Sequence, residues 1–419
     1  MRGEPASGAG GFGGKGAFSR RRLLGASAAA GLVAAVGGTA GCASSQKLLG
    51  GSAQQAAVST PRVSAPRPDG VLGANFNGDP RVMTFPELED VGATWIRGFA
   101  DMSKLDQDNP GQTPAVKALL AAAGRGYGTV LSLKFPYFKK PLPGPGTPDM
   151  AAEVRRLDAV LQAVMGKVDI LVVGNEPFIE TLDSDHNGRI NEFYEQLAKR
   201  AIQHRDKNPG KTQLYMGSLN HLDQPAWRTP ATERWMEFVR NTPAIMGTDI
   251  HPHLPDPGAD RFYLDYVLPR MRPDQKFLAT EFSLVLFYHK HLKDPVSPEF
   301  ADRYHVRQGT PAWQVIKQAL TNPFPQQKWD DFLAMQPWFA NHKEYMTNQM
   351  DRFRKTGKLA VATYGIGQDA AMSGDKFGPT STPWLLNSIF CQHTVQASGN
   401  GLPGRNRVWA DQFRALQHS

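Results

Sequence analysis

The segment VDILVVGNEP, residues 168–177, joins a short apolar run to an abrupt polar end. An apolar run of this length is typical of a strand that is buried on both faces of a parallel sheet. Asn175, Glu176 and Pro177 follow the run, although acidic residues and proline are disfavoured inside strands. The stretch therefore predicts a buried strand, Val168–Gly174, that presents a carboxylate at its carboxyl end.

Seven further apolar or β-branched runs resemble this one, and longer helical patterns separate them. The clearest helical stripe lies within residues 154–164, with apolar residues at helical spacing. Eight such alternations in about 350 residues predict an α/β fold, a (β/α)8 TIM barrel over residues 70–419. No Gly-rich nucleotide fingerprint follows the first run, which weakens the open doubly wound alternative. The other predicted strands are Val71–Phe76, Thr94–Phe99, Thr129–Phe135, Gln213–Leu219, Ile245–Ile250, Lys276–Glu281 and Leu359–Gly365.

One connection, residues 282–358 between the seventh and eighth strands, is oversized and rich in aromatic residues. A connection of this size is seldom a bare loop, so we expect a helical insertion between strands 7 and 8 that forms a small cap. Helix-like patterns cover Pro311–Leu320 and Lys328–Met335. We expect most of its aromatic residues to form a satellite core, although some could reach the barrel mouth and stack on ligand rings.

The first 42 residues read as an export signal. Arg20, Arg21 and Arg22 precede a modest apolar stretch and match the twin-arginine pattern. The stretch ends in small residues and Cys42, which resembles a bacterial lipobox with an acylated cysteine. A membrane-spanning anchor is the alternative, but the stretch is rich in Gly and Ala and falls short of about 20 strongly apolar residues. We expect an exported protein, lipid-anchored on the outer face of the cell membrane or secreted, with residues 43–69 as a flexible tether.

Charge and cysteine content limit the classes of function. The chain has 47 basic and 39 acidic residues, and without residues 1–42 it has 42 and 38. The excess of positive charge is small and no block of like charge occurs, so we expect no nucleic-acid partner. Cys42 and Cys391 are the only cysteines. If Cys42 is acylated, Cys391 has no disulfide partner and is expected to be a buried, inert thiol.

Two glutamates close predicted strands of the barrel. Glu176 follows the fourth strand, and Glu281 ends the seventh. In (β/α)8 barrels the chemistry takes place at the carboxyl ends of the strands. A pair of glutamates at that edge can supply a protonated acid for a leaving oxygen and a carboxylate for an anomeric carbon.

These features resemble clan A of the glycoside hydrolases, which are retaining (β/α)8-barrel enzymes, and the resemblance spans roughly residues 70–400. It implies that Glu176 is the general acid/base, that Glu281 is the nucleophile and that Asn175 holds the sugar 2-hydroxyl. It also implies an arginine near the nucleophile, for which Arg97 is the candidate. An arginine there keeps a carboxylate ionised. The clan usually presents a Trp on strand eight, but this strand carries Tyr364.

Further polar and aromatic residues are candidates for substrate binding. Tyr364 could replace the missing platform, or Trp384 in the following loop could take that position. Asn220, at the end of the fifth strand, could face the mouth or make turn bonds, as could its neighbour His221.

His251 and His253 follow the sixth strand and share one face by alternation. In clan A this neighbourhood often carries a residue that bonds the nucleophile or the substrate. Structural hydrogen bonding is a second explanation. A metal pair is a third, because neutral imidazoles favour zinc and other transition metals, but the sequence shows no further ligand at comparable positions.

A loop after the fourth strand, residues 183–190, has oxygen-bearing side chains at alternate positions. Asp183, Asp185 and Asn187 precede a turn-making Gly188, as at the start of an EF-hand loop. The twelfth position is Tyr194 instead of a bidentate Glu, which would weaken calcium binding. Calcium is therefore a possible structural ligand, and a turn without metal is the alternative. We expect no required cofactor.

The sequence as a whole predicts an exported retaining β-glycosidase that acts on a poly- or oligosaccharide by a two-glutamate double displacement. Two alternatives stay open. One is a cell-surface lipoprotein that binds carbohydrate without chemistry, and the other is a metal-dependent barrel hydrolase that uses His251 and His253. In the glycosidase, Glu176 needs a pKa raised toward neutrality while Arg97 keeps Glu281 ionised.

Overall fold

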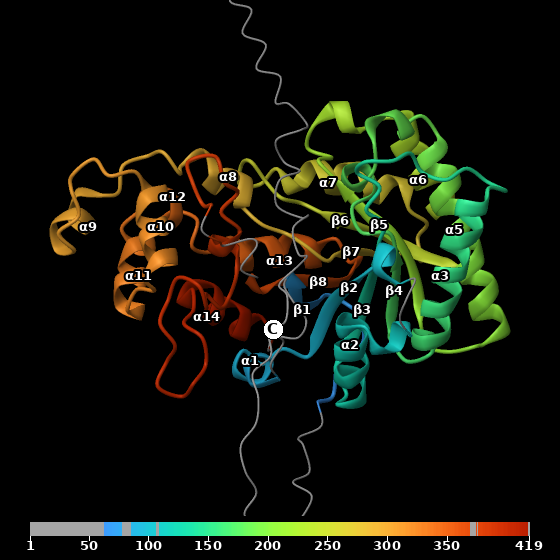
Figure 1. Cartoon of the computed structure of the whole chain (residues 1–419), viewed down its shortest axis with the longest axis horizontal. Coiled ribbons are helices and arrows are strands. Elements are labelled where there is room, and N and C mark those ends of the chain that lie inside the picture. Colours follow the sequence, from blue (N-terminus) through green and yellow to red (C-terminus); the bar gives the residue numbers. More distant parts are fainter. Residues whose placement is uncertain (1–62, 78–84, 106–108, 369–373, 375, 418–419) are drawn as a thin grey trace, which may run out of the picture. The chain divides into compact units, whose positions relative to one another are not determined.

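The structure, a computed structural model, describes residues 63–77, 85–105, 109–368, 374 and 376–417. Eight parallel strands close into a barrel in the order of the sequence (Figure 1). All eight predicted strands are present, so the predicted (β/α)8 barrel is confirmed. The strands are β1 (Val71–Asn77), β2 (Trp95–Asp101), β3 (Gly128–Lys134), β4 (Ile170–Val173), β5 (Gln213–Asn220), β6 (Ile245–His251), β7 (Phe277–Ala279) and β8 (Leu359–Gln368).

The two strands that precede the glutamates are shorter than predicted. β4 ends at Val173, where Gly174 adopts a φ of +112°. A Cβ on this residue would lie 2.0 Å from the carbonyl oxygen of Gly217, so only glycine fits there. β7 ends at Ala279. Glu176 and Glu281 therefore lie in the loops just beyond their strands.

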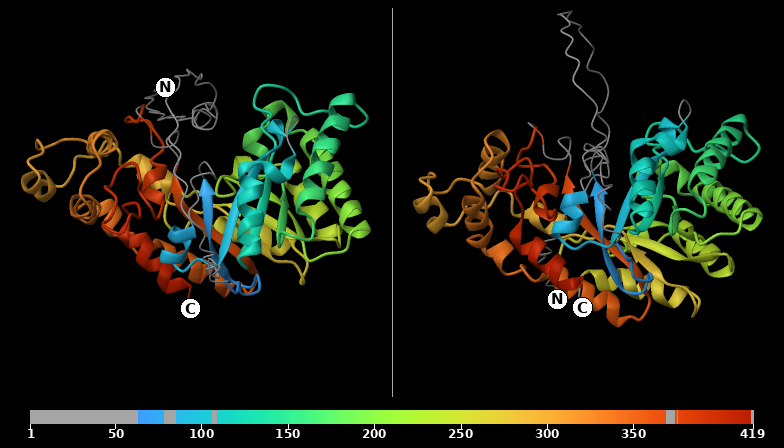
Figure 2. Two further views of the ribbon diagram at one scale, coloured as in Figure 1. Left: turned by 60° about the horizontal axis from the view of Figure 1, so that its bottom comes forward. Right: turned by 90° about the horizontal axis from the view of Figure 1, so that it is seen from below.

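Helices surround the strands, as Figures 1 and 2 show for α2, α3, α5 and α6. The predicted stripe lies on α3, where Leu157, Val160, Leu161 and Val164 are buried. Thr147 caps this helix by accepting a hydrogen bond from the backbone N–H of Met150. The helices outside the β7–β8 connection are α1 (Phe85–Asp90), α2 (Pro114–Gly124), α3 (Pro148–Val164), α4 (Pro177–Glu180), α5 (Arg189–Lys207), α6 (Pro230–Asn241), α7 (Asp260–Val267) and α14 (Arg407–Leu416).

The chain between β7 and β8 forms six helices. Figures 1 and 2 show α9, α10 and α11 to one side of the strands. Trp329 and Phe339 are buried, and Phe339 packs 5.4 Å from Trp409 of α14 between ring centroids. Closure of this segment over the barrel mouth stays a prediction. The helices are α8 (Val285–Lys290), α9 (Pro298–Arg303), α10 (Ala312–Thr321), α11 (Gln326–Ala334), α12 (Pro337–Ala340) and α13 (Tyr345–Lys355).

The barrel interior is layered along the strands. Near the strand starts it is apolar, with Trp95 of β2 packed among eight other buried side chains. Two residues further along β2 the inward position holds Arg97, because side chains alternate along a strand. Arg97 is fully buried. The apolar layer consists of Val71, Trp95, Val130, Ile170, Val172, Tyr215, Leu278, Ala360 and Val361.

Part of the predicted tether packs against the barrel. The backbone N–H of Val63 donates to Arg125 O at 2.8 Å, and Trp95 Nε1 donates to Pro66 O at 2.9 Å. The packed chain thus includes residues 63–69, which sequence composition alone assigned to the tether. The predicted signal, the lipobox with Cys42 and residues 43–62 lie outside the described residues. None of the described helices is both long and apolar enough to cross a bilayer.

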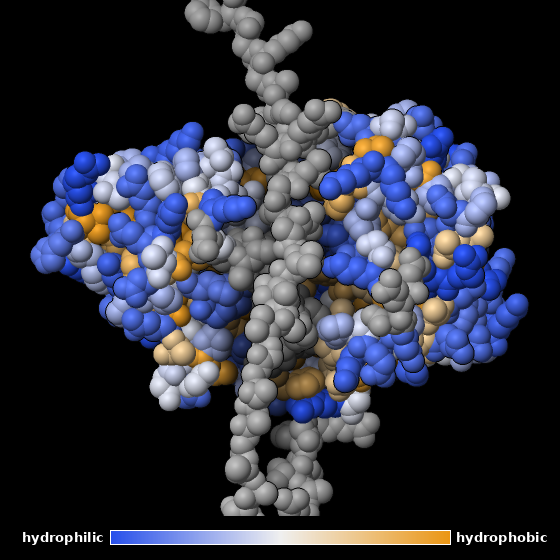
Figure 3. Space-filling model, viewed as in Figure 1, coloured by the Kyte–Doolittle hydropathy of each residue, from blue (hydrophilic) through white to orange (hydrophobic). Residues whose placement is uncertain are grey.

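Cys391 is free and buried, as predicted, and burial raises its pKa to about 12. On the face shown in Figure 3 the described residues are mostly hydrophilic, with hydrophobic ones scattered among them. Scattered apolar residues of this kind are ordinary on the surface of a folded protein. The large apolar side chains are collected between the strands and the helices instead.

Candidate active site

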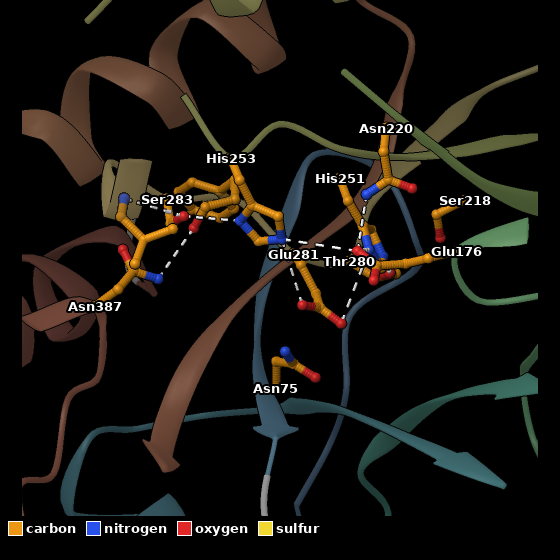
Figure 4. A network of polar contacts seen from close by, with 12 residues as sticks. Asn75, Glu176, Ser218, Asn220, His251, His253, Thr280, Glu281, Ser283 and Asn387 are labelled. Carbon is orange, nitrogen blue, oxygen red and sulfur yellow. Dashed lines mark hydrogen bonds and ion pairs between the residues drawn. The ribbon is translucent and has the colours of Figure 1, made fainter. Parts of the chain in front are cut away.

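The carboxyl end of β6 and the loops after β4, β6 and β7 bring two glutamates and two histidines together (Figure 4). One ligand atom from each of Glu176, His251, His253 and Glu281 lies within 4.8 Å of all the others. The Glu176 side chain is 20% exposed and the Glu281 side chain 12% exposed. Both carboxylates are thus close together and reachable from solvent.

Arg97 neutralises Glu281. Its Nη1 donates to Glu281 Oε1 at 2.6 Å, and the guanidinium is fully buried. Burial alone raises the pKa of the Glu281 carboxyl, but the positive charges of His251 and Arg97 outweigh burial and lower it well below its usual value. Glu281 is therefore ionised at neutral pH, as a nucleophile must be.

Three further hydrogen bonds fix the Arg97 guanidinium. Its Nε donates to Ser132 Oγ at 3.1 Å, its Nη1 to Asn75 Oδ1 at 3.1 Å and its Nη2 to Asn175 Oδ1 at 2.5 Å. These acceptors come from β3, β1 and the loop after β4. Because the planar guanidinium is bonded on every side, it can hold Glu281 in one position.

His251 lies against Glu176. Its Nδ1 is 3.0 Å from Glu176 Oε1, and its Nε2 is 2.9 Å from Thr280 Oγ1. Thr280 Oγ1 donates its own proton to Asp249 Oδ2 at 2.5 Å. The hydroxyl must then accept from Nε2–H, so Nε2 is protonated and one further proton is left between Nδ1 and Glu176.

The predicted rise of the Glu176 pKa is wrong for this arrangement. Burial raises the pKa of the Glu176 carboxyl, but the hydrogen bond and the charge of His251 outweigh burial and lower it. Burial lowers the pKa of His251, but the neighbouring carboxylates of Glu281, Asp249 and Glu176 outweigh burial and raise it above its usual value. The sequence analysis considered Glu281 and burial as neighbours of Glu176 and did not anticipate a buried imidazole in contact with it.

His253 lies beside Glu281 and an aromatic ring. Its Nδ1 is 2.7 Å from Ser283 Oγ, and its Nε2 is 3.6 Å from Glu281 Oε2. The indole of Trp384 meets the His253 ring edge to face, with 4.9 Å between centroids. Trp384 is thus the predicted aromatic residue that the structure places at the site.

Asn220 contacts Glu176, whereas the side chain of His221 packs on another residue. Asn220 Nδ2 donates to Glu176 Oε1 at 2.8 Å, while its Oδ1 is buried without a hydrogen-bond partner among the described residues. His221 packs its ring on Trp227 with 4.6 Å between centroids. Burial lowers the pKa of His221 to about 4, so this imidazole is neutral at pH 7.

The polar groups of two predicted substrate-binding residues bond to other residues of the protein. Tyr364 is fully buried on the outward side of β8, between Phe282 and Trp409, and its hydroxyl donates to Asn387. Strand alternation explains this, because Thr363 and not Tyr364 has the inward position. Asn175 uses Oδ1 for Arg97 and Nδ2 for Glu180, at 2.8 Å. Its amide therefore orients the guanidinium.

Sequence reasoning missed several polar residues near the site. Asp249 is fully buried and receives hydrogen bonds from Ser218 and Thr280. Lys134, at the end of β3, pairs with Glu180 at 3.2 Å. Asp249 precedes His251 by two residues, so strand alternation could have predicted that both side chains face inward. Lys134 is the last residue of its strand, so its position at the strand end could have indicated the site.

The predicted calcium loop forms a short 3-10 turn, Asp183–Asp185. Asp185 is buried, accepts a hydrogen bond from the backbone N–H of Leu142 at 2.9 Å and lies 3.6 Å from Arg189 Nη1. A carboxylate that already binds two protein donors has less capacity to bind calcium. Calcium at this loop stays a prediction.

No protein-family model and no curated protein sequence matches this chain. Among solved structures it is similar to a GH10 endoxylanase from a sugarcane soil metagenome, with 13% identity, 84% of this chain and 98% of that chain covered, and a TM-score of 0.48. It is also similar to a glucosidase from Croceicoccus marinus (11% identity, 85% and 67% covered, TM-score 0.47) and to xylanase 10B from Thermotoga maritima (12%, 83% and 96%, 0.41). The fold assignment rests on the strand order of this chain.

Proposed function

We propose that the protein is a retaining β-glycosidase that hydrolyses O-glycosidic bonds of a poly- or oligosaccharide. The observation that carries the proposal is the pair of glutamates. Oxygens of Glu176 and Glu281 lie within 4.8 Å of each other at the carboxyl end of the barrel, and both side chains reach solvent. Retaining glycosidases need carboxyl groups about 5 to 5.5 Å apart, whereas inverting enzymes need a gap of about 6.5 to 9.5 Å for a water.

Glu281 is the proposed nucleophile. The Arg97 guanidinium and the histidines hold it ionised, and its Oε2 lies away from Arg97, toward His253. This oxygen attacks the anomeric carbon and forms a glycosyl-enzyme ester, while the leaving oxygen receives a proton. A water then cleaves the ester after giving its proton to the second carboxylate.

Glu176 is the proposed acid/base, and His251 holds its proton in the free enzyme. With Nε2–H committed to Thr280, the single proton between Nδ1 and Glu176 Oε1 makes either an ion pair or a neutral pair. Both forms contain the same number of protons. A bound sugar that excludes water disfavours the ion pair, so the proton moves to Glu176 without uptake from solvent.

Substrate contacts follow from the polar atoms that remain. Asn220 Oδ1 is buried and unbonded among the described residues, so it can accept a sugar hydroxyl. The Trp384 indole lies against His253 and offers an apolar face at the mouth. Arg97 acts on Glu281, and Asn175 orients Arg97. As part of the same proposal, the twin-arginine pattern of Arg20–Arg22 and the lipobox at Cys42 in the sequence favour an exported, lipid-anchored enzyme.

The test is Glu281→Ala assayed on a panel of 4-nitrophenyl glycosides. Activity should fall below detection, and sodium azide should restore turnover and yield a glycosyl azide of inverted configuration, because the small anion replaces the missing carboxylate. Full activity in Glu281→Ala would refute the mechanism. Binding of glycans by the wild-type chain without turnover on any of them would support a carbohydrate-binding lipoprotein instead.

A further inference from the structure

The four side chains at the site form a second kind of arrangement, the four-donor cluster of Glu176, His251, His253 and Glu281. Among the described residues it is the one group of three or more carboxylates, imidazoles or thiols close enough to share an ion. His251 Nδ1 lies 3.0 Å from Glu176 Oε1 and 3.8 Å from Glu281 Oε1, and His253 Nε2 lies 4.0 Å from Glu176 Oε1 and 3.6 Å from Glu281 Oε2. In a tetrahedral zinc site with bonds of about 2.0 to 2.2 Å, ligand atoms lie about 3.3 to 3.6 Å apart.

Both imidazoles are oriented as metal ligands are. His251 Nε2 is bonded to Thr280 Oγ1 at 2.9 Å and lies 3.5 Å from Asp249 Oδ2, which leaves Nδ1 facing the cluster. His253 Nδ1 is bonded to Ser283 Oγ at 2.7 Å, which leaves Nε2 facing the cluster. Metal-bound histidines usually donate their other N–H to a carboxylate or another oxygen in this way.

His253 Nε2 has no hydrogen-bond partner among the described residues, although the residue is only 9% exposed. Figure 4 shows its ring turned toward the Glu281 carboxylate. A buried nitrogen without a partner costs free energy unless something binds it. In the glycosidase mechanism this imidazole acts on Glu281 only through its charge, which leaves the Nε2 atom without a hydrogen-bond partner among the described residues.

The charges favour a divalent cation. Three carboxylates surround the site. Those of Glu176 and Asp249 lie against His251, and that of Glu281 pairs with the Arg97 guanidinium. Lys134 is paired with Glu180. With neutral imidazoles, the three carboxylates and Arg97 together have a net charge of −2. Two nitrogen ligands select zinc or a neighbouring transition metal over magnesium or calcium, which prefer oxygen.

We propose that the four-donor cluster binds one Zn²⁺ ion and that this ion reversibly inhibits hydrolysis. The inhibition rests on the proposed function, whereas the binding does not. An ion in the cluster uses the lone pair with which Glu281 attacks the anomeric carbon. It also displaces the proton that Glu176 gives to the leaving oxygen. Sugar and zinc therefore exclude each other, and the inhibition is competitive.

The experiment measures zinc binding and activity separately on the metal-free full chain. Isothermal calorimetry with Zn²⁺ should give one ion per chain, and Co²⁺ should give the visible absorption of a four-coordinate site. His253→Ala should weaken Zn²⁺ binding at least about 10-fold, and Ser283→Ala by about 10-fold, because it leaves the imidazole unoriented. His204→Ala, on the outer helix α5, is the matched control and should bind Zn²⁺ as the wild type does.

Absence of stoichiometric Zn²⁺ binding, or equal affinity in His253→Ala and wild type, would overturn the site. Zinc should raise KM without lowering kcat, and EDTA should restore full activity. Hydrolysis that requires zinc would overturn the inhibitory role and favour a metal-dependent hydrolase. If zinc binds as expected but azide fails to rescue Glu281→Ala, the proposed glycosidase mechanism fails and the metal site stands.

Discussion

The two ends of the barrel interior are both built from inward-facing side chains of the strands but hold opposite chemistry. Near the strand starts, Trp95 packs among apolar side chains. Toward the strand ends, Arg97, Asp249 and His251 are equally buried and charged or polar. Along β2 the two kinds of layer are only two residues apart.

The difference separates stability from chemistry. Burial of the apolar layer favours folding directly. Burial of the polar layer costs free energy that its ion pairs only partly offset. The buried Arg97 and the three carboxylates therefore lower the stability of the fold, and we interpret this loss as the cost of a site that acts on a ligand. The predictions below change one layer at a time.

After Glu281→Ala, the largest effect is expected for Glu176→Gln. Without a proton donor, kcat/KM on substrates with poor leaving groups should fall by about 10² to 10⁴-fold. Substrates with a dinitrophenolate leaving group need little protonation, so their first step should change far less. Steady-state kinetics on both classes measures this. Glu192→Gln, an exposed acid in the first turn of α5, is the control and should behave as wild type. An equal loss on both substrate classes would speak against an acid role.

Arg97→Met should lower the free energy of unfolding by about 3 to 5 kcal/mol, because it leaves Glu281 buried without its cation. Arg200→Met is the control, since Arg200 forms a two-pronged pair with Asp158 at 2.6 and 2.8 Å but on an exposed helix face. The control should lose less than about 1 kcal/mol. Denaturant titration of both variants decides the matter. Equal losses would mean that burial does not distinguish the two pairs.

Trp95→Ala tests the apolar layer by itself. Removing this buried indole should lower the free energy of unfolding by about 3 to 5 kcal/mol. The kcat/KM of the folded fraction should stay unchanged, because Trp95 packs in the apolar layer and its indole N–H donates to Pro66 O. Gly128→Ala is a companion variant, since its Cβ would lie 2.2 Å from the indole, and overpacking should cost about 1 to 3 kcal/mol. A fall in kcat/KM at full folding would show that the layers are coupled.

The sequence predicted the barrel well because its strands are apolar on both faces and its helices have a clear period. It also indicated Glu176, Glu281 and Arg97, since each lies at or near the end of a predicted strand. It could not predict which neighbour acts on Glu176. The contact between His251 and Glu176 joins residues 75 positions apart, and its effect on the pKa depends on burial and on Thr280. Tyr364 was misplaced because a one-residue difference in alternation moves a side chain to the other face.

The smallest effect is expected for an ion pair outside both layers. Arg270 Nε and Nη2 donate to the Glu233 carboxylate at 2.8 Å each, and these hydrogen bonds lower the Glu233 pKa more than its slight burial raises it. A carboxyl whose pKa is lower in the folded state stabilises the fold above its unfolded pKa of about 4.3, and that contribution disappears as the pH falls through the folded value. Both side chains are exposed by a third or more, so solvent screening limits the gain. Glu233→Gln should therefore lose less than about 1 kcal/mol at pH 7 and nothing at low pH, and 1 M salt should reduce the difference. Denaturant titrations at pH 7 and pH 3 measure this. If Glu233→Gln lost as much unfolding free energy as Arg97→Met, the loss would come from breaking a charge pair and not from the burial of that pair.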